Sequence, residues 1–205
     1  MRFLVSGVAG DIGLGIGRII KYWGIAKKVY GIDILKNHPG EFVFDKCYKA
    51  PHAENKNYFE WITEFFKKKS IDLFIPTSES EISMISRLGV NKFKNIKILI
   101  NNKFTVDNCL DKYKCLTFLE KKGIQVPKYG LIENKAPDNF PFIVKPRFGQ
   151  GSKGVRVISN KKELDLCQSG LVWQELLVPN NEEYTCPIYF NKNNKIRILL
   201  IKREL

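Results

Sequence analysis

Residues 142–157 read FIVKPRFGQGSKGVRV, and this stretch decides how the second half of the chain folds. An apolar run ends at Lys145, and a loop with three glycines separates it from a second strand-like segment: Gly149, Gly151 and Gly154. The pattern predicts two antiparallel strands joined by a flexible loop. Exposed backbone N–H groups in such a loop suit phosphate oxygens, and Lys145 adds a positive charge at its start. The alternative is an ordinary hairpin turn, because one glycine-rich loop is weak evidence by itself.

Short strand-like segments also follow this stretch. LVWQELL (171–177), EYTCPIYF (183–190) and KIRILLIKREL (195–205) are rich in β-branched and aromatic residues, and NKNN joins the last two into a predicted β-hairpin. Before the stretch, residues 105–123 predict one helix that starts at Thr105 or Asp107 and ends at Gly123. We therefore expect an α+β module over residues 105–205.

The first hundred residues alternate strands and helices. Apolar runs predict strands over residues 3–8, 27–35, 71–78 and 95–100, the third of which stops at Pro76. Helical spacing predicts helices over 12–23, 58–69 and 79–88. This βαβ alternation predicts a parallel sheet covered by helices. The expected fold class is α/β, with the first domain over residues 1–104.

A second glycine cluster, SGVAGDIGLGIG, occupies residues 6–17. Gly7, Gly10 and Gly13 follow the first strand and open a helix, and Asp33 ends the second strand. This is similar to the fingerprint of short-chain dehydrogenases and sugar epimerases, which implies NAD(P) binding. That family also needs a tyrosine four residues before a lysine, and none of the eight tyrosines has one. The other interpretation is a tight strand-to-helix turn, so the dehydrogenase remains the alternative function.

Composition narrows the class of protein. The net charge of +13 comes from lysines spread along the chain, which favours a solvated surface that attracts anionic substrates over nucleic-acid binding. No apolar run approaches about 18 residues, and the N-terminus is interpreted as a strand and turn, so we expect no membrane association and a cytoplasmic location. The five cysteines include no C-x-x-C pair, and the chain has two histidines. We therefore expect reduced thiols and no zinc site.

Several motifs together resemble the ATP-grasp superfamily, whose ATP site lies between two α+β subdomains. The matching features are Asp111-Lys112 on a helix, the Lys-Pro strand with its GQGSKG loop, and a hinge before a Glu-Tyr strand in VWQELLVPNNEEYTC (172–186). IPTSESE (75–81) is similar to a segment of the carbamoyl-phosphate-synthase large-subunit type and related amino-acid ligases. The resemblance implies a Rossmann-like pre-ATP-grasp domain over residues 1–104 and the first ATP-grasp subdomain over residues 105–205.

The resemblance also implies an activity and a set of ATP contacts. The activity is ATP-dependent ligation of a small-molecule carboxylate to an amine or ammonia through an acyl phosphate. Lys112 and Lys145 would contact the phosphates, Glu175 and Leu177 the adenine, and Glu183 the ribose. The loop would close over the β- and γ-phosphates with Gly149, Gln150, Gly151, Ser152 and Gly154. From the residues alone, Lys112 also fits a solvated helix lysine and Glu183 an exposed strand residue.

The family's metal ligands, an acidic residue and a Glu-x-Asn, belong to the second ATP-grasp subdomain. No Glu-x-Asn follows Glu183 in this sequence. We therefore expect the second subdomain to be missing, Mg²⁺ to bind only with a C-terminal half, and the chain to be inactive alone. An exposed apolar face is expected where that half would pack. The expected partner is a second copy of the chain or a complementary C-terminal fragment.

Overall fold

The computed structural model describes residues 1–203, except 94–95, 135, 180, 192 and 194. The chain divides into two compact units. Unit 1 comprises Met1–Cys115 with Phe148–Gln150, and unit 2 comprises Leu116–Arg147 with Gly151–Leu205. Each unit has its own β-sheet and its own apolar core.

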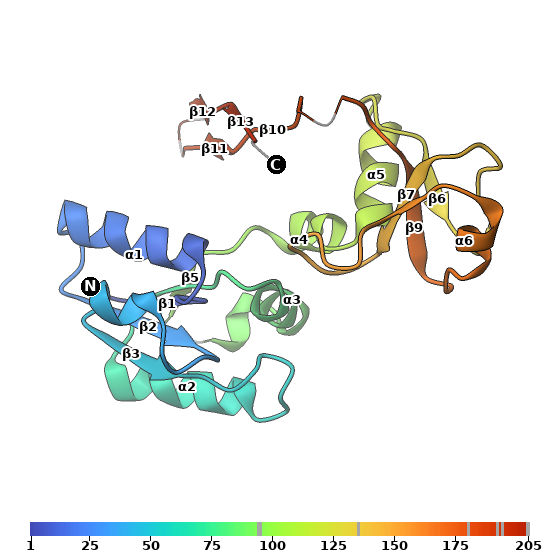
Figure 1. Ribbon diagram of the computed structural model, residues 1–205. Coiled ribbons are helices and arrows are strands. Elements are labelled where there is room, and N and C mark those ends of the chain that lie inside the picture. Colours follow the sequence, from blue (N-terminus) through green and yellow to red (C-terminus); the bar gives the residue numbers. More distant parts are fainter. Residues whose placement is uncertain (94–95, 135, 180, 192, 194, 204–205) are drawn as a thin grey trace. The chain divides into compact units, whose positions relative to one another are not determined.

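Unit 1 is an α/β domain in which strands and helices alternate (Figure 1). Its strands run parallel in the order β3-β2-β1-β4-β5, which confirms the predicted parallel sheet. The strands are β1 (Arg2–Ser6), β2 (Lys28–Asp33), β3 (Lys46–Lys49), β4 (Leu73–Ile75) and β5 (Lys97–Ile98). The helices are α1 (Asp11–Trp23), α2 (Tyr58–Lys69), α3 (Glu79–Leu88) and α4 (Lys103–Cys109), with 3₁₀ turns η1 (Pro39–Phe42) and η2 (Val90–Lys92).

The alternation of side chains along the strands divides the core of unit 1 into two layers. Val5 on β1 packs in one layer with Ile20 of α1. Its neighbour Leu4 faces the opposite way and packs with apolar side chains of α2 and α3: Tyr58, Ile62, Phe65, Phe66, Met84 and Ile85. Side chains alternate between the two faces of each strand, and the apolar stripes of the helices cover both faces. Both faces of the sheet are therefore buried, as parallel sheets require.

The predicted helix over residues 105–123 is wrong in two respects. The structure has two helices here, α4 and α5 (Lys112–Lys121), and Asp111 lies buried between them. Asn102 caps α4 by accepting a hydrogen bond from Thr105 N at 2.9 Å, so neither Thr105 nor Asp107 starts the helix. Asp111 Oδ1 accepts one from Lys114 N at 3.1 Å, as an N-cap does for a new helix.

Strand ends are also shorter than predicted. β4 begins at Leu73, later than predicted, and it ends before Pro76 as predicted, because proline has no N–H for the ladder. The strand predicted over residues 95–100 is reduced to β5 (Lys97–Ile98), and Asn95 lies outside the described residues. The edge strand β3 carries little apolar periodicity and was not predicted.

Unit 2 contains an antiparallel sheet with strand order β6-β9-β7-β8. The strands are β6 (Tyr129–Leu131), β7 (Phe142–Pro146), β8 (Arg156–Ile158) and β9 (Leu171–Glu175), and the short helix α6 (Lys161–Asp165) follows β8. Phe142 and Val144 on β7 are buried with Ile158 and with Leu164 of α6. The predicted antiparallel pair around the glycine loop is therefore confirmed as β7 and β8.

The end of unit 2 is a β-hairpin with exposed apolar side chains. β10 (Tyr184–Thr185) pairs with β13 (Ile201–Lys202), and β11 (Ile188–Phe190) pairs with β12 (Ile196–Ile198). This confirms the predicted hairpin for the described residues. The exposed side chains are Tyr184, Ile188, Tyr189, Phe190, Ile196, Ile198, Leu199, Leu200 and Ile201. The apolar face expected from the sequence is therefore present, and its partner stays a prediction. An isolated two-stranded hairpin is only marginally stable in water.

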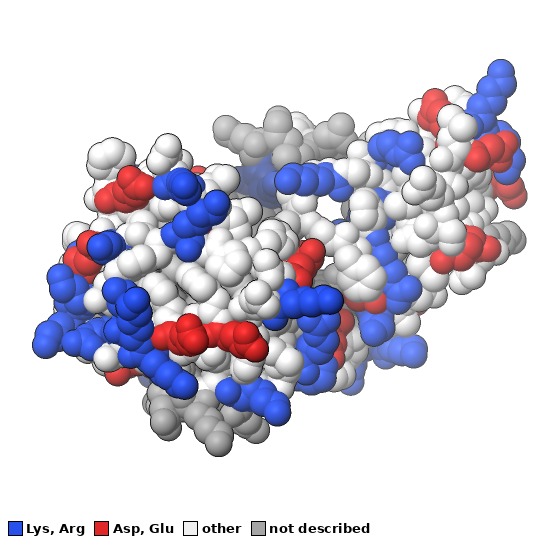
Figure 2. Space-filling model, turned by 90° about the horizontal axis from the view of Figure 1, so that it is seen from below, with Lys and Arg blue, Asp and Glu red and all other residues white. Residues whose placement is uncertain are grey.

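Charge is distributed rather than gathered on the face seen in Figure 2. Lys and Arg side chains are interspersed there with Asp, Glu and uncharged residues. This matches the spread of lysines along the sequence. Within the part of the chain that the structure describes, no helix is both long and apolar enough to cross a membrane.

The turn from β1 into α1 gives a prediction about packing. A Cβ at Gly13 would lie 2.4 Å from Gly7 O, whereas a Cβ at Gly15 on the same helix would meet nothing within 4 Å. Both Gly→Ala changes raise helix propensity equally. We expect Gly13→Ala to lower the free energy of unfolding by about 1–3 kcal/mol and Gly15→Ala to leave it unchanged or raise it by up to about 1 kcal/mol. Urea denaturation measures both, and equal stabilities would contradict this packing.

Candidate functional site

The order of the unit 1 sheet reverses between β1 and β4, and polar residues meet at the carboxyl ends of these two strands. Gly7 has φ +61°, and its carbonyl accepts a hydrogen bond from Gly10 N at 3.1 Å. The β4 turn lies against it, because Thr77 Oγ1 donates to Ser6 O at 2.7 Å. The first glycine cluster therefore makes the tight strand-to-helix turn predicted as one of its two interpretations.

Asp33, at the end of β2, is used by this turn. Its side chain is buried, Oδ2 accepts from Ala9 N at 2.8 Å, and Oδ1 accepts from Leu35 N at 3.0 Å. Both carboxylate oxygens thus stabilise the backbone around the glycine cluster. A ribose diol at this position would have to compete with the two backbone amides that already donate to this carboxylate.

A buried carboxylate that sequence analysis missed lies beside the turn. Glu81 on α3 accepts hydrogen bonds from Ser6 Oγ, Tyr58 Oη and Ser78 Oγ, the last at 2.7 Å. Burial and the neighbouring Glu81 carboxylate raise the pKa of Tyr58 well above its ordinary value. The network ties β1, α2 and α3 together, and its sequence signal was Glu81 three residues after the N-cap Ser78.

In unit 2, Lys145 and Gln174 form the polar centre of the sheet. β7 and β9 are adjacent and antiparallel, with Ile143 opposite Gln174 and Lys145 opposite Val172. Lys145 Nζ donates to Gln174 Oε1 at 2.6 Å. Because side chains alternate along a strand, Lys145 lies on the face opposite Phe142 and Val144, whose side chains are buried in the core. Gln174 is a site residue that sequence analysis missed.

The glycine loop after β7 has the backbone that its sequence predicts. Positive φ angles occur at Gly149 (113°), Gly151 (68°), Ser152 (56°) and Gly154 (78°). Added Cβ atoms at Gly149 and Gly151 would meet nothing within 4 Å, so the backbone there is open to a ligand. Gly154 instead packs against Pro146, where a Cβ would lie 2.9 Å from Pro146 Cγ. The loop thus has an open part and an anchored end.

Lys112, one of the residues predicted to contact the phosphates, contacts the part of this loop that belongs to unit 1. Lys112, the first residue of α5, donates from Nζ to Gly149 O at 2.5 Å. Gly149 and Gln150 also line a cavity of about 630 Å³ in unit 1 with residues of α3 and its surroundings. Lys112 therefore contacts the loop in this structure, and its assignment to the ATP phosphates stays a prediction.

The predicted adenine and ribose contacts lie in the last part of unit 2. Glu175, the last residue of β9, is exposed, and its Oε2 accepts from Lys128 N at 3.0 Å. Leu177 is exposed in the following segment. Glu183 forms an ion pair with Arg203 across the β10–β13 hairpin. Each of these residues is at the surface, and their assignment to adenine and ribose stays a prediction.

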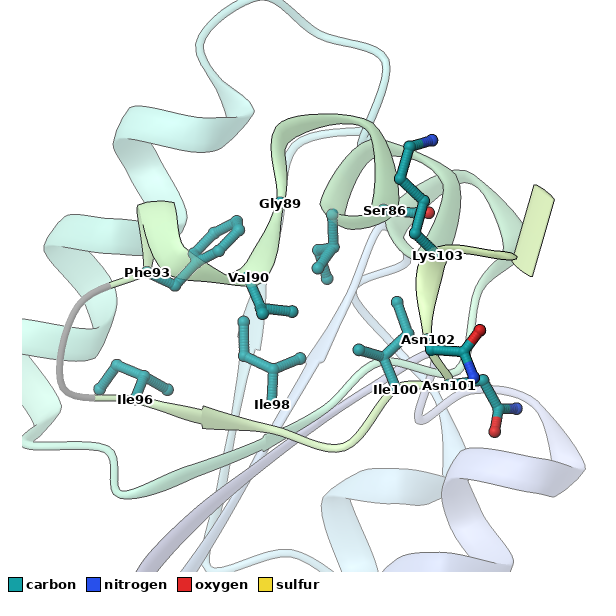
Figure 3. A pocket seen from close by; sticks show the side chains of 11 residues that line it. Ser86, Gly89, Val90, Phe93, Ile96, Ile98, Ile100, Asn101, Asn102 and Lys103 are labelled. Carbon is teal, nitrogen blue, oxygen red and sulfur yellow. The ribbon is translucent and has the colours of Figure 1, made fainter. Parts of the chain in front are cut away.

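A larger cavity in unit 1 has a different character (Figure 3). It measures about 880 Å³ and lies between α3, η2 and β5. Ile98 and Val90 face one another across it, and the Lys103 side chain points away from them. Lys103 Nζ is 2.6 Å from Asp107 Oδ2. Apolar walls and an ion-paired lysine do not suit a nucleotide, so the phosphate site is not placed here.

Metal-ligand and thiol chemistry find little support in the described residues. They include no group of three or more His, Cys, Asp or Glu side chains placed to hold a metal ion. All five cysteines are free thiols, and burial together with nearby Glu41 and Asp33 raises the pKa of Cys47 to about 11. The expected cytoplasmic location stays a prediction.

Fold and site together define an α/β domain followed by an antiparallel sheet that carries a lysine and a glycine loop. Residues 109–205 match the family model described as ATP-grasp domain. This match confirms the predicted resemblance to the ATP-grasp superfamily for these residues.

Relatives extend the similarity along the chain. The carbamoyl phosphate synthase large chain of Neisseria meningitidis serogroup A is 23% identical over 222 aligned residues, which cover 93% of this chain and 20% of that protein. The crystal structure of N5-carboxyaminoimidazole ribonucleotide synthetase from Thermotoga maritima is 23% identical with a TM-score of 0.68, covering 98% of this chain and 53% of that one. This chain thus spans about a fifth of the curated relatives and about half of such solved structures.

A third similar structure is the biotin carboxylase domain of Hydrogenobacter thermophilus 2-oxoglutarate carboxylase, in complex with MgADP, ADP and bicarbonate. It is 16% identical with a TM-score of 0.67, covering 96% of this chain and 48% of that one. At such identities the solved structures show a common fold, and the predicted fold class is confirmed.

The matches do not support the dehydrogenase and epimerase alternative. The physical reason lies in Asp33, whose two carboxylate oxygens bind Ala9 N and Leu35 N of the chain itself. The pattern of Gly7, Gly10 and Gly13 with an acidic residue at the end of β2 is explained here by the tight turn. The same pattern in the sequence suggested a dinucleotide site.

A pair of variants tests the role of Asp33. In Asp33→Asn, the amide nitrogen would face a backbone N–H, so we expect the free energy of unfolding to fall by about 1–3 kcal/mol. Asp11→Asn, an exposed residue in the first turn of α1, is the matched control and should change it by less than about 1 kcal/mol. Urea denaturation followed by circular dichroism measures both. Equal effects would show that Asp33 does not stabilise the turn.

Proposed function

We propose that the chain is the ATP-binding portion of an ATP-dependent ligase that joins a carboxylate to an amine or ammonia. The observation that carries the proposal is Lys145, held on β7 at the start of an open glycine loop. The ATP-grasp match over residues 109–205 and the similarity to ligases of known structure support it. The proposed domains are a Rossmann-like domain over residues 1–104 and the first ATP-grasp subdomain over residues 105–205.

Each proposed contact follows from the type of side chain and its position. Lys145 and Lys112 supply positive charge to the phosphates, and the open backbone of residues 149–154 supplies N–H groups to the β- and γ-phosphates. The end of β9 presents Glu175 to adenine, the hinge after it presents Leu177, and Glu183 presents a carboxylate to the ribose hydroxyls. No catalytic nucleophile is assigned, because phosphoryl transfer needs alignment and charge neutralisation more than covalent help.

The proposed chemistry has two steps. A carboxylate oxygen of the first substrate attacks the γ-phosphorus of ATP, and ADP leaves with the electron pair of the broken P–O bond. The nitrogen of the second substrate then attacks the acyl carbon, loses a proton, and inorganic phosphate leaves. Lys145 and the loop amides stabilise the negative charge of the transferring phosphoryl group. Both substrates are small molecules.

In this proposal, Mg²⁺ binds only together with ATP. The similar biotin carboxylase structure contains MgADP. The described residues of this chain offer no group of three or more acidic, His or Cys ligands, so we assign no metal ligand and derive no step through the ion. When bound to the nucleotide, Mg²⁺ supplies charge neutralisation to the phosphates. A second copy of the chain or a complementary C-terminal fragment remains the proposed partner.

Calorimetric titration with ATP and Mg²⁺ tests the proposal. We expect the wild-type chain to bind ATP and Lys145→Ala to bind about 10- to 100-fold more weakly, because it loses a charge-assisted contact of about 1.5–3 kcal/mol. Lys162→Ala, on the exposed face of the short helix α6, is the matched control and should bind as the wild type does. Failure of the wild type to bind ATP, or equal affinities of all three proteins, would overturn the proposed function or its site.

A further inference from the structure

Gln174 occupies a position that fixes the phosphate-site lysine. It lies on β9, an inner strand paired with β6 through Tyr129 and with β7 through Ile143. Pairing on both sides sets the backbone of Gln174. Lys145 is the diagonal neighbour of Gln174 across the β7–β9 pair, a distance that two long side chains span. The 2.6 Å contact from Lys145 Nζ to Gln174 Oε1 is therefore built on paired strands and not on a loop.

The chemistry of the two groups decides which atoms meet. An ammonium group can only donate hydrogen bonds, so the amide atom that it contacts must be Oε1 and not Nε2. This assignment orients the whole Gln174 amide. Restricting the lysine side chain beforehand removes rotamer freedom that would otherwise be lost when a phosphate binds. The contact thus pre-orients the ammonium.

A neutral hydrogen-bond acceptor and a carboxylate would have different effects on the positive potential around Lys145. The Gln174 amide orients the ammonium through a dipole and adds no negative charge beside it. A carboxylate at the same position would form an ion pair, and at a partly buried site that pair would offset much of the positive potential offered to a phosphate. The adjacent acidic residue Glu175 alternates to the other face of β9, and its Oε2 accepts from Lys128 N.

We infer that Gln174 is a positioning residue, which holds Lys145 toward the ATP phosphates through a neutral acceptor that adds no negative charge of its own. The inference rests on the proposed ATP site and adds to it a side chain that no sequence motif indicated. It distinguishes Gln174 from a residue that only stabilises the sheet. A positioning role affects ligands with phosphates, whereas a structural role affects every ligand of the site equally.

Two substitutions separate charge from orientation. Gln174→Glu keeps the acceptor and adds a negative charge, and Gln174→Met keeps the approximate size and removes the acceptor. We expect the affinity for ATP to fall about 10- to 100-fold in Gln174→Glu and about 3- to 10-fold in Gln174→Met. The affinity for adenosine, which has no phosphate, should stay within about twofold in both. Gln168→Glu, at an exposed position before β9, is the matched control and should change neither affinity.

The readout is calorimetric titration with ATP and with adenosine, after urea denaturation has shown that the variants fold. Equal losses for ATP and adenosine would overturn the positioning role and leave the proposed ATP site intact. Failure of the wild type to bind either ligand would overturn the proposed function itself.

A ligand-free measurement tests the contact directly. Lysine side chains carrying ¹³C-methyl groups are titrated by NMR, and the Lys145 signal is identified by its loss in Lys145→Arg. The pKa of Lys145 should rise in Gln174→Glu relative to the wild type, because a carboxylate favours the charged ammonium. A Lys145 signal with the same shift and pKa in the wild type, Gln174→Glu and Gln174→Met would overturn the inference whether or not ATP binds.

Discussion

The alternation of side chains along β7 is the constraint on which the proposed site depends. Phe142 and Val144 are buried on one face of the sheet, so the residues between and after them must lie on the other face. Lys145 is therefore directed away from the core by the same packing that holds the strand in place. A shift of one residue in the pairing with β9 would turn the ammonium toward the core formed by Phe142 and Ile158 and would turn Val144 away from it. The apolar core thus fixes the position of a polar group.

The two glycine clusters differ in what surrounds their backbone. In the β1–α1 turn, Gly13 lets the helix backbone approach Gly7, and Asp33 accepts hydrogen bonds from the surrounding amides. The hydrogen-bonding groups of that turn therefore bind one another within the chain. In the loop after β7, Gly149 and Gly151 have no neighbour at the Cβ position. The difference between a structural turn and a ligand loop is therefore what the local backbone already contacts, and a glycine pattern does not record that.

The parts predicted from the sequence are those fixed by local periodicity. The bounds of α2 and α3, the parallel sheet and the β7–β8 pair all follow from apolar spacing over a few residues. The break between α4 and α5 escaped prediction because it depends on the buried carboxylate of Asp111, whose burial is a tertiary property. Gln174 and Glu81 escaped for a related reason. Each acts through partners on other elements. The Ser78–Glu81 spacing indicates the start of α3, but no spacing indicates the hydrogen bond of Glu81 with Tyr58 or of Gln174 with Lys145.

The proposed ATP contacts divide by how firmly the structure holds them. Lys145 sits in a four-stranded sheet with a core of its own, and Gln174 holds its side chain. Glu183 sits at the open end of a two-stranded hairpin whose apolar side chains are exposed, and its carboxylate is paired with Arg203. A two-stranded hairpin gains little stability from its own pairing, and an exposed ion pair adds about 1 kcal/mol at most. In the proposed ATP site, the phosphate contacts are therefore better organised than the ribose contact, which lies on a hairpin whose apolar face is exposed.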